Sequence, residues 1–109
     1  MRQKLFTKDI DKQLFKQYPF GNQLGKQKVI CKIFNPYGRG LWYVLNSDSE
    51  DPDYLWCIVQ LYEIEVGSVS RKELESIRIR GFLPLERDIS FDPMNAVEVL
   101  KKLTEGGRP

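Results

Sequence analysis

The sequence predicts an α+β fold, a single small domain with a mostly antiparallel sheet and three short helices packed on it. Segments with the apolar spacing of helices alternate with segments that have the spacing of strands, in the order helix, hairpin, strand, helix, strand, helix. A chain of 109 residues is long enough to bury a core of its own. We therefore expect one domain over residues 1–105, followed by a flexible tail over residues 106–109.

The first half of the chain predicts a helix and a hairpin. Residues 7–19 place apolar side chains at helical spacing after Thr7, a good helix cap, and Pro19 ends the pattern. Residues 28–34 and 41–46 have the composition and alternation of strands, and the turn between them reads "NPYGRG". A turn this short predicts that the two strands pair as a hairpin.

A long strand and a short helix are expected next. Residues 47–53, "SDSEDPD", are acidic and contain proline, so they predict a solvated loop. Residues 54–66 are apolar and long enough to be the central strand of the sheet. Ser70 precedes Glu73 by three residues, which is the spacing of a helix-capping pair, so we expect the second helix to begin there.

The stretch "LERDISF", residues 85–91, predicts a last strand. Alternation divides its side chains into a set that is apolar except for one arginine (Leu85, Arg87, Ile89 and Phe91) and a polar set (Glu86, Asp88 and Ser90). The third helix is then predicted from Asp92 as its cap and Pro93 as its first residue.

Composition excludes several kinds of site. The chain has no histidine, which removes histidine-activated nucleophiles and histidine-ligated metals, and it has no GxxxxGK[ST] phosphate-binding loop. No apolar run approaches the about twenty residues of a membrane helix, and the amino-terminal stretch lacks the pattern of a secretion signal. We expect a cytoplasmic protein without a cofactor or membrane contact.

Both cysteines, Cys31 and Cys57, lie in apolar, strand-like segments. Such cysteines in a chain with no secretion signal are typical of buried free thiols that act as small hydrophobic residues. A disulfide would require the two strands to be neighbours in the sheet.

Carboxylates occur close together at several places. Residues 47–53 lack the glycine and the distal glutamate of a calcium-binding loop, so we place no metal there. Glu63 and Glu65 share a face of a predicted strand, as do Glu86 and Asp88, and such pairs can serve as acid and base or hold a divalent ion. Charges that alternate along a half-exposed strand are more typical of its solvent face. We therefore name no catalytic and no metal-binding residue.

Arg87 is the one charged residue on the apolar side of its predicted strand. An isolated buried charge costs several kcal/mol, so its guanidinium must be paired or reach the sheet edge. We expect Glu73 or Glu75 of the second helix to be its partner. The alternative is an arginine that faces a ligand.

Charge is distributed unevenly along the chain. Residues 1–46 carry nine Lys or Arg against two Asp, a balance of +7, and residues 47–109 have a balance of −5. Basic residues in the first part alternate with aromatic ones such as Trp42 and Tyr43, a pattern used for binding single-stranded nucleic acid. Most of these rings have spacings compatible with the core, and we expect the two parts to neutralise each other in the fold.

Four stretches together resemble a known family: "LFTKDIDKQL", "KIFNPYGRGLWYVLN", "EIEVGSVSRKELESI" and "GFLPLERDISF". In this order and at these distances, over roughly residues 4–92, they are similar to small bacterial proteins of unknown function, the family DUF2958. The resemblance implies a context of plasmids, phages and integrative conjugative elements, and it implies no activity. The start of the "ELES" helix departs from the family pattern at Val69, Arg71 and Lys72.

The sequence thus predicts a non-enzymatic accessory protein of a bacterial mobile element that acts on an unknown protein partner. One alternative is a weak binder of single-stranded nucleic acid. A second is a small metal-dependent hydrolase using Glu63, Glu65, Glu86 and Asp88. The residues we expect to form a functional or structural cluster are Trp42, Tyr43, Glu73, Glu86, Arg87 and Asp88.

Overall fold

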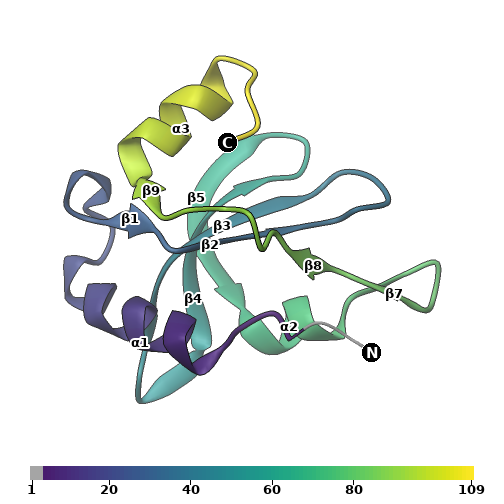
Figure 1. Ribbon diagram of the computed structural model, residues 1–109, viewed down its shortest axis with the longest axis horizontal. Coiled ribbons are helices and arrows are strands. Elements are labelled where there is room, and N and C mark those ends of the chain that lie inside the picture. Colours follow the sequence, from purple (N-terminus) through teal and green to yellow (C-terminus); the bar gives the residue numbers. More distant parts are fainter. Residues whose placement is uncertain (1–3) are drawn as a thin grey trace.

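A five-stranded antiparallel sheet organises the molecule (Figure 1). The computed structural model describes residues 4–109, and within them the strand order of the main sheet is β5-β4-β3-β2-β8. The strands are β2 (Cys31–Phe34), β3 (Leu41–Asp48), β4 (Asp51–Gln60), β5 (Ile64–Ser70) and β8 (Glu86–Arg87). All neighbours pair antiparallel, which confirms the predicted α+β class.

Helices cover both faces of this sheet. On one face, here the helix-pair face, α1 (Lys8–Gln17) and α2 (Arg71–Ser76) bury Leu14 and Leu74 against the strands. On the other, the α3 face, α3 (Ala96–Thr104) buries Val99 and Leu103. Figure 1 shows α3 above the sheet and α1 and α2 below it. The three predicted helices are therefore confirmed.

Smaller elements complete the fold. Two 3₁₀ turns, η1 (Tyr18–Phe20) and η2 (Leu24–Lys26), follow α1. The short strands β1 (Lys28–Val29) and β9 (Met94–Asn95) pair with each other, as do β6 (Arg78–Ile79) and β7 (Leu83–Pro84). The β6–β7 hairpin forms an arm that extends away from the sheet, at the right of Figure 1.

The central strand is β3, which is buried on both faces. Trp42 and Val44 join the core of the helix-pair face, and Leu41, Tyr43 and Leu45 join the core of the α3 face. A strand in the middle of a covered sheet needs apolar side chains on both sides, and this explains the uninterrupted apolar run "LWYVL".

The predicted central strand over residues 54–66 is wrong, because the chain turns at residues 61–63 and returns as β5. Leu61 and Tyr62 make this run look continuous in the sequence, yet in the turn they are 45% and 84% exposed. The predicted acidic loop is also wrong. Only residues 49 and 50 form the turn, which is closed by a hydrogen bond from the amide of Glu50 to Asp48 Oδ1, and β4 begins at Asp51.

The last predicted strand is shorter than expected. After β8, Asp88 Oδ1 accepts a hydrogen bond from the amide of Ser90 and starts a turn, so the alternation stops there. Ile89 is consequently 78% exposed, and Phe91 packs on the α3 face instead of beside Leu85.

The predicted start of the third helix is also wrong. Asn95 caps α3, and its side chain accepts hydrogen bonds from the amides of Val97 and Glu98. Asp92 and Pro93, the predicted cap and first residue, precede β9.

Cys31 and Cys57 are buried free thiols, as predicted. Val44 of β3 lies opposite both of them, so the strands that carry them are not neighbours. The segment after α3 returns to the sheet, where Lys32 Nζ donates to the main-chain oxygen of Pro109 at 3.2 Å. Flexibility of residues 106–109 stays a prediction.

Candidate binding cleft

A cleft of about 510 Å³ opens on the helix-pair face, between β5, α2 and the β6–β7 arm. Its lining combines apolar and polar side chains. The apolar side chains belong to Trp42, Val59, Leu61, Val69, Leu74, Ile77, Ile79 and Leu85. The polar ones belong to Asn35, Arg39, Glu65, Ser68, Ser70 and Glu73. An apolar hollow with a few polar groups is the usual composition of a binding site.

Gly67 leaves the cleft unfilled beside β5. It lines the cleft from β5, opposite Cys57, and a Cβ atom placed on it would meet no atom within 4 Å. Its φ lies outside the left-handed region, so the backbone conformation does not require glycine. A side chain here would project into open space, so the sequence leaves room at this position.

Gly40 fixes the position of the tryptophan in the cleft. Its φ is +134°, and a Cβ atom would lie 2.7 Å from Cη2 of Trp42, so only glycine fits. The ring of Trp42 is 7% exposed and lines the cleft. The turn "NPYGRG" therefore both reverses the chain and allows this ring to pack against the backbone.

The start of α2 is fixed by two side chains. Ser70 Oγ accepts a hydrogen bond from the amide of Glu73 at 3.2 Å, which confirms the predicted cap, and donates to Asp53 at 3.0 Å. Asp53 in turn accepts a hydrogen bond from the amide of Lys72 at 2.9 Å. This amide, with help from Ser70, holds the pKa of the Asp53 carboxyl below its usual value. The cap thus orders the end of the cleft that Ser70 and Glu73 line.

Arg71 connects α2 to α1. Its Nη1 lies 2.8 Å from Asp11 Oδ1, its Nε donates to the carbonyl oxygen of Pro52 at 2.7 Å, and its guanidinium lies 4.5 Å from the ring centre of Phe6. The side chain is only 12% exposed. These contacts hold the two helices of this face in a fixed relation.

The edge strand β5 borders the cleft along Glu65, Gly67 and Val69. It has seven residues, contains no Lys or Pro, and pairs with β4 without a register shift. Natural edge strands are usually protected by lysine, proline, a bulge or short length. The opposite edge, β8, has only two residues. The long edge of the sheet is therefore the unprotected one.

A family model described as "protein of unknown function (DUF2958)" matches residues 5–106. The chain belongs to this family. The predicted resemblance is thereby confirmed, and the match extends beyond β8 through α3. No curated protein and no solved structure matches the chain. Among the residues that the structure describes, no helix is long and apolar enough to cross a membrane.

Two of the six residues expected to form a cluster in this DUF2958 protein, Trp42 and Glu73, line the cleft. Tyr43, the neighbour of Trp42, points to the α3 face, where its ring centre lies 6.1 Å from that of Phe91. Burial raises the pKa of the Tyr43 hydroxyl to about 12. The adjacent aromatic residues therefore belong to different cores.

The other three predicted residues lie at the far edge of the sheet, where Glu86 and Arg87 form β8 and Asp88 follows it. Glu86 lies opposite Phe34, and Asp88 forms an ion pair with Lys32 at 3.7 Å. Arg87 lies opposite Ile33, on the side of the helix-pair face. The alternation of residues 86–88 is thus as predicted.

The predicted partner of Arg87 is wrong. Its Nη1 donates to the main-chain oxygens of Lys4 and Leu5. Glu73 and Glu75 are exposed, and neither takes part in the ion pairs found within residues 4–109. The guanidinium is thus bound by backbone carbonyls that come from the other end of the sequence.

The carboxylates of the hydrolase hypothesis do not converge. Glu63 and Glu65 lie at the β5 edge and Glu86 and Asp88 at the β8 edge, with three strands between them. Among residues 4–109 no group of three or more Asp, Glu, Cys or His side chains is placed to hold a metal ion. The four residues therefore cannot act as one site in this fold.

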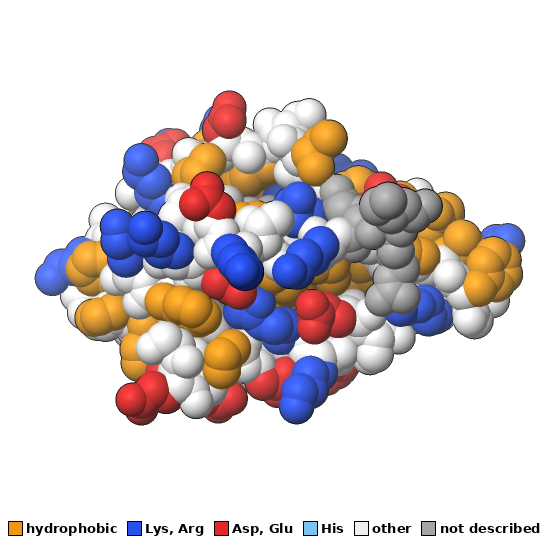
Figure 2. Space-filling model, turned by 60° about the horizontal axis from the view of Figure 1, so that its bottom comes forward, with side chains coloured by type: hydrophobic (Ala, Val, Ile, Leu, Met, Phe, Trp, Pro, Cys, Tyr) orange, Lys and Arg blue, Asp and Glu red, His pale blue; other side chains and the backbone are white. Residues whose placement is uncertain are grey.

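Nucleic-acid binding through Trp42 and Tyr43 is also unsupported by their positions. The rings are 7% and 0% exposed, so neither can stack on a base. On the face that Figure 2 shows, basic and acidic side chains are interspersed, and no single-sign area dominates it.

The residues that shape the cleft most, Gly67 and Gly40, are absent from the predicted site residues. A glycine inside a strand is a known sign of a bulge or of close approach by another group, and the "EVGSVS" segment carries this sign. The capping signal of Ser70, three residues later, favours a helix start and obscures it.

Proposed function

We propose that this protein binds an extended segment of a partner protein, which adds as a sixth strand at the free edge of β5 and places one side chain in the cleft. The observation that carries this proposal is the coincidence of an unprotected edge strand with an apolar cleft along that strand. Strand addition of this kind uses main-chain hydrogen bonds for affinity and pockets for alternate side chains for specificity.

The backbone of β5 has hydrogen-bonding groups to spare. Every second residue of an edge strand directs its N–H and C=O away from the sheet. Within residues 4–109, none of the backbone hydrogen bonds outside the helices and ladders involves residues 64–69. Glu65, Val66 and Ser68 are exposed. An added strand could therefore form hydrogen bonds with free backbone N–H and C=O groups along most of this edge.

Side chains of the cleft predict the chemistry of the segment. A residue placed opposite Gly67 would enter the cleft and contact Trp42 or Leu74, so we expect it to be apolar and large. The next residue on the same side would lie opposite Glu65, and Glu73 lines the cleft from α2. A Lys or Arg at that second position would complement these carboxylates.

The cellular setting is part of the proposal. Two buried free thiols fit a reducing compartment, so we propose that the protein acts in the cytoplasm. We further propose a role as a non-enzymatic accessory protein of a bacterial mobile element, the context that the resemblance implies for this family of unknown function. The partner is then expected to be encoded by the same element or by a host process that the element uses.

Selection from a displayed library of random peptides tests the binding mode. We expect enriched peptides without proline, in which a large apolar residue and a basic residue are two positions apart. Gly67→Leu, which fills the cleft, is expected to weaken each enriched peptide at least ten-fold.

The matched control is Gly25→Leu. A Cβ atom placed on Gly25 would likewise meet no atom within 4 Å, and its φ is not left-handed, but this residue lies in η2, away from the cleft. Unchanged melting temperatures would establish that both variants fold. A library that yields no binder, or peptides that Gly67→Leu binds as tightly as the wild type does, would contradict the proposal.

A further inference from the structure

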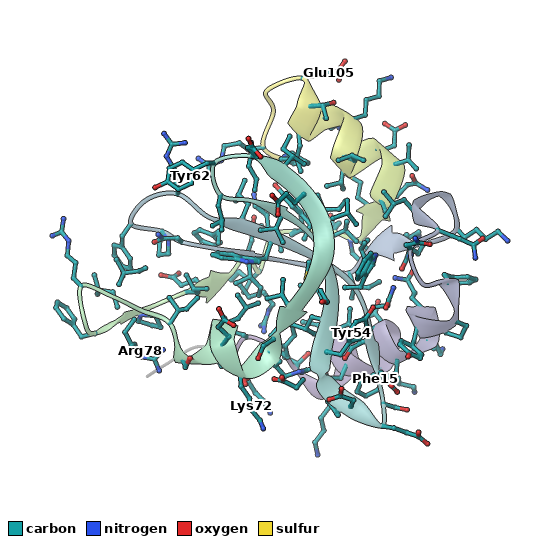
Figure 3. All side chains as sticks on the ribbon, turned by 180° about the vertical axis from the view of Figure 1, so that it is seen from behind. Phe15, Tyr54, Tyr62, Lys72, Arg78 and Glu105 are labelled. Carbon is teal, nitrogen blue, oxygen red and sulfur yellow. The ribbon has the colours of Figure 1, made fainter. Side chains whose placement is uncertain are left out.

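A second hollow, of about 450 Å³, lies where two hairpin turns meet the segment after α3. The turn between β2 and β3 contributes residues 38–40, and the turn between β4 and β5 contributes Leu61 and Tyr62. Arg108 closes it from the segment that follows α3. Figure 3 shows Tyr62 at this end of the sheet, close to where that segment returns.

The hollow contains two guanidinium groups and no carboxylate. Arg39 and Arg108 line it, and none of its described lining residues is Asp or Glu. Neither arginine takes part in the ion pairs found within residues 4–109. Two unneutralised cations in one concave site create a positive potential that favours an anion.

Arg39 is held in place by groups that leave its charge uncompensated. Its guanidinium lies 5.0 Å from the ring centre of Tyr62, and its carbonyl oxygen accepts a hydrogen bond from Asn35 Nδ2 at 3.0 Å. A guanidinium that contacts an aromatic ring in this way makes no hydrogen bond to it, so its N–H groups stay available to a ligand. The amides of Arg39 and Gly40 donate to no residue in the described part of the chain.

We infer that this hollow is an anion site that takes a phosphate group. The guanidinium fork binds phosphate oxygens in pairs, and a second arginine matches the second charge of a phosphate monoester. Tyr62 is 84% exposed, so its ring has surface left for a nucleobase next to the phosphate. Arg39 and Leu61 line both this hollow and the peptide cleft, whereas Tyr62 and Arg108 line the hollow and not the cleft. Arg108→Ala therefore tests the anion site separately from the peptide cleft.

Titration with sodium phosphate, monitored through the NMR chemical shifts of the backbone amides, tests the site. Sodium chloride at equal ionic strength is the reference, since unspecific screening would affect both titrations alike. We expect phosphate to change the amide chemical shifts of residues 38–41 and 60–62 until the site is saturated. Arg108→Ala and Arg39→Ala are each expected to weaken phosphate binding at least ten-fold. Arg108→Lys is expected to retain part of the affinity.

Arg80→Ala is the matched control, because it removes one positive charge at the exposed tip of the β6–β7 arm. We expect it to leave phosphate binding unchanged. Adenosine monophosphate and a short single-stranded oligonucleotide extend the test. If adenosine monophosphate binds more tightly than phosphate and shifts the signals of the Tyr62 ring, the ligand is a nucleotide. If the oligonucleotide binds more tightly, the ligand is a nucleic-acid backbone. Phosphate shifts no larger than those with chloride, or an equal loss in Arg80→Ala, would overturn the inference.

Discussion

Arg71 shows how much a single residue contributes to the cleft. Its guanidinium contacts Asp11 of α1, the carbonyl oxygen of Pro52 and the ring of Phe6, and its side chain is 12% exposed. Removing one partner of a mostly buried ion pair leaves the other charge uncompensated. We expect Arg71→Ala to lower the free energy of unfolding by about 2–3 kcal/mol, measured by urea denaturation.

The control for this prediction is Lys72→Ala, one position along the same helix. The side chain of Lys72 is exposed, so we expect its loss to change stability by less than about 0.5 kcal/mol. A double-mutant cycle with Asp11→Ala isolates the contribution of the pair. Equal effects of Arg71→Ala and Lys72→Ala would show that Arg71 does not link the helices.

Residue-level prediction from sequence succeeds where the signal is local. The pattern of residues 86–88, the Ser70 cap and the buried thiols need only alternation, spacing and composition. It fails where the partner is distant in sequence. Arg87 binds the carbonyl oxygen of Leu5, 82 positions away, and no local pattern marks a backbone oxygen as a partner. Gly67 contributes an empty volume, which only the packed structure reveals.

At the scale of an element, the start of α3 separates two candidate caps. Asn95 Oδ1 accepts hydrogen bonds from the amides of Val97 at 2.9 Å and Glu98 at 3.3 Å, whereas Asp92 is exposed and precedes β9. We expect Asn95→Ala to cost about 1 kcal/mol in thermal or urea unfolding, the usual loss for a helix cap. Asp92→Ala is expected to change stability by less than about 0.5 kcal/mol. A larger loss of stability in Asp92→Ala than in Asn95→Ala would instead show that Asp92 caps the helix, as the sequence predicts.

The turn between β2 and β3, which carries proline and glycine, is predicted well, and the turn between β4 and β5, which carries neither, is not. The hairpin at "NPYGRG" contains both proline and glycine, and its two strands pair as expected. The turn between β4 and β5 consists of Leu61, Tyr62 and Glu63, so apolar content alone extends the predicted strand across it. This error hides the edge strand β5, on which the proposed function depends.

At the scale of the whole molecule, both ion pairs within residues 4–109 join the basic first part of the chain to the second part. Lys32 pairs with Asp88, and Asp11 pairs with Arg71. The segments with opposite charge balance thus meet in the fold, but each of these pairs neutralises individual charges and leaves most of the basic residues at the surface. Composition predicts this balance of charge. It cannot predict the hollow that Arg39 and Arg108 both line, because that hollow forms from three separate segments.

Alkaline conditions provide the last prediction for the molecule as a whole. Burial raises the pKa of Cys31 from 9.0 to about 12, that of Tyr43 from 10.0 to about 12, and that of Cys57 well above its usual value. Below pH 9 both the folded and the unfolded chain keep these protons, so stability does not depend on them. Above pH 9 for the two cysteines, and above pH 10 for Tyr43, the unfolded chain releases protons that the folded chain retains. The free energy of unfolding should then fall by up to about 1.4 kcal/mol per pH unit for each group.

Tyr43→Phe isolates one part of this loss. The hydroxyl of Tyr43 is buried without a hydrogen-bond partner in the described chain, so at neutral pH its removal should be neutral or stabilise the fold by up to about 1 kcal/mol. Between pH 10 and about 12, where Tyr43 contributes, the variant should lose stability less steeply than the wild type in urea unfolding. Tyr37→Phe, which alters a ring that is 50% exposed, controls for loss of a hydroxyl. Identical alkaline slopes for Tyr43→Phe and the wild type would mean that the Tyr43 hydroxyl ionises as readily in the folded protein as in the unfolded chain.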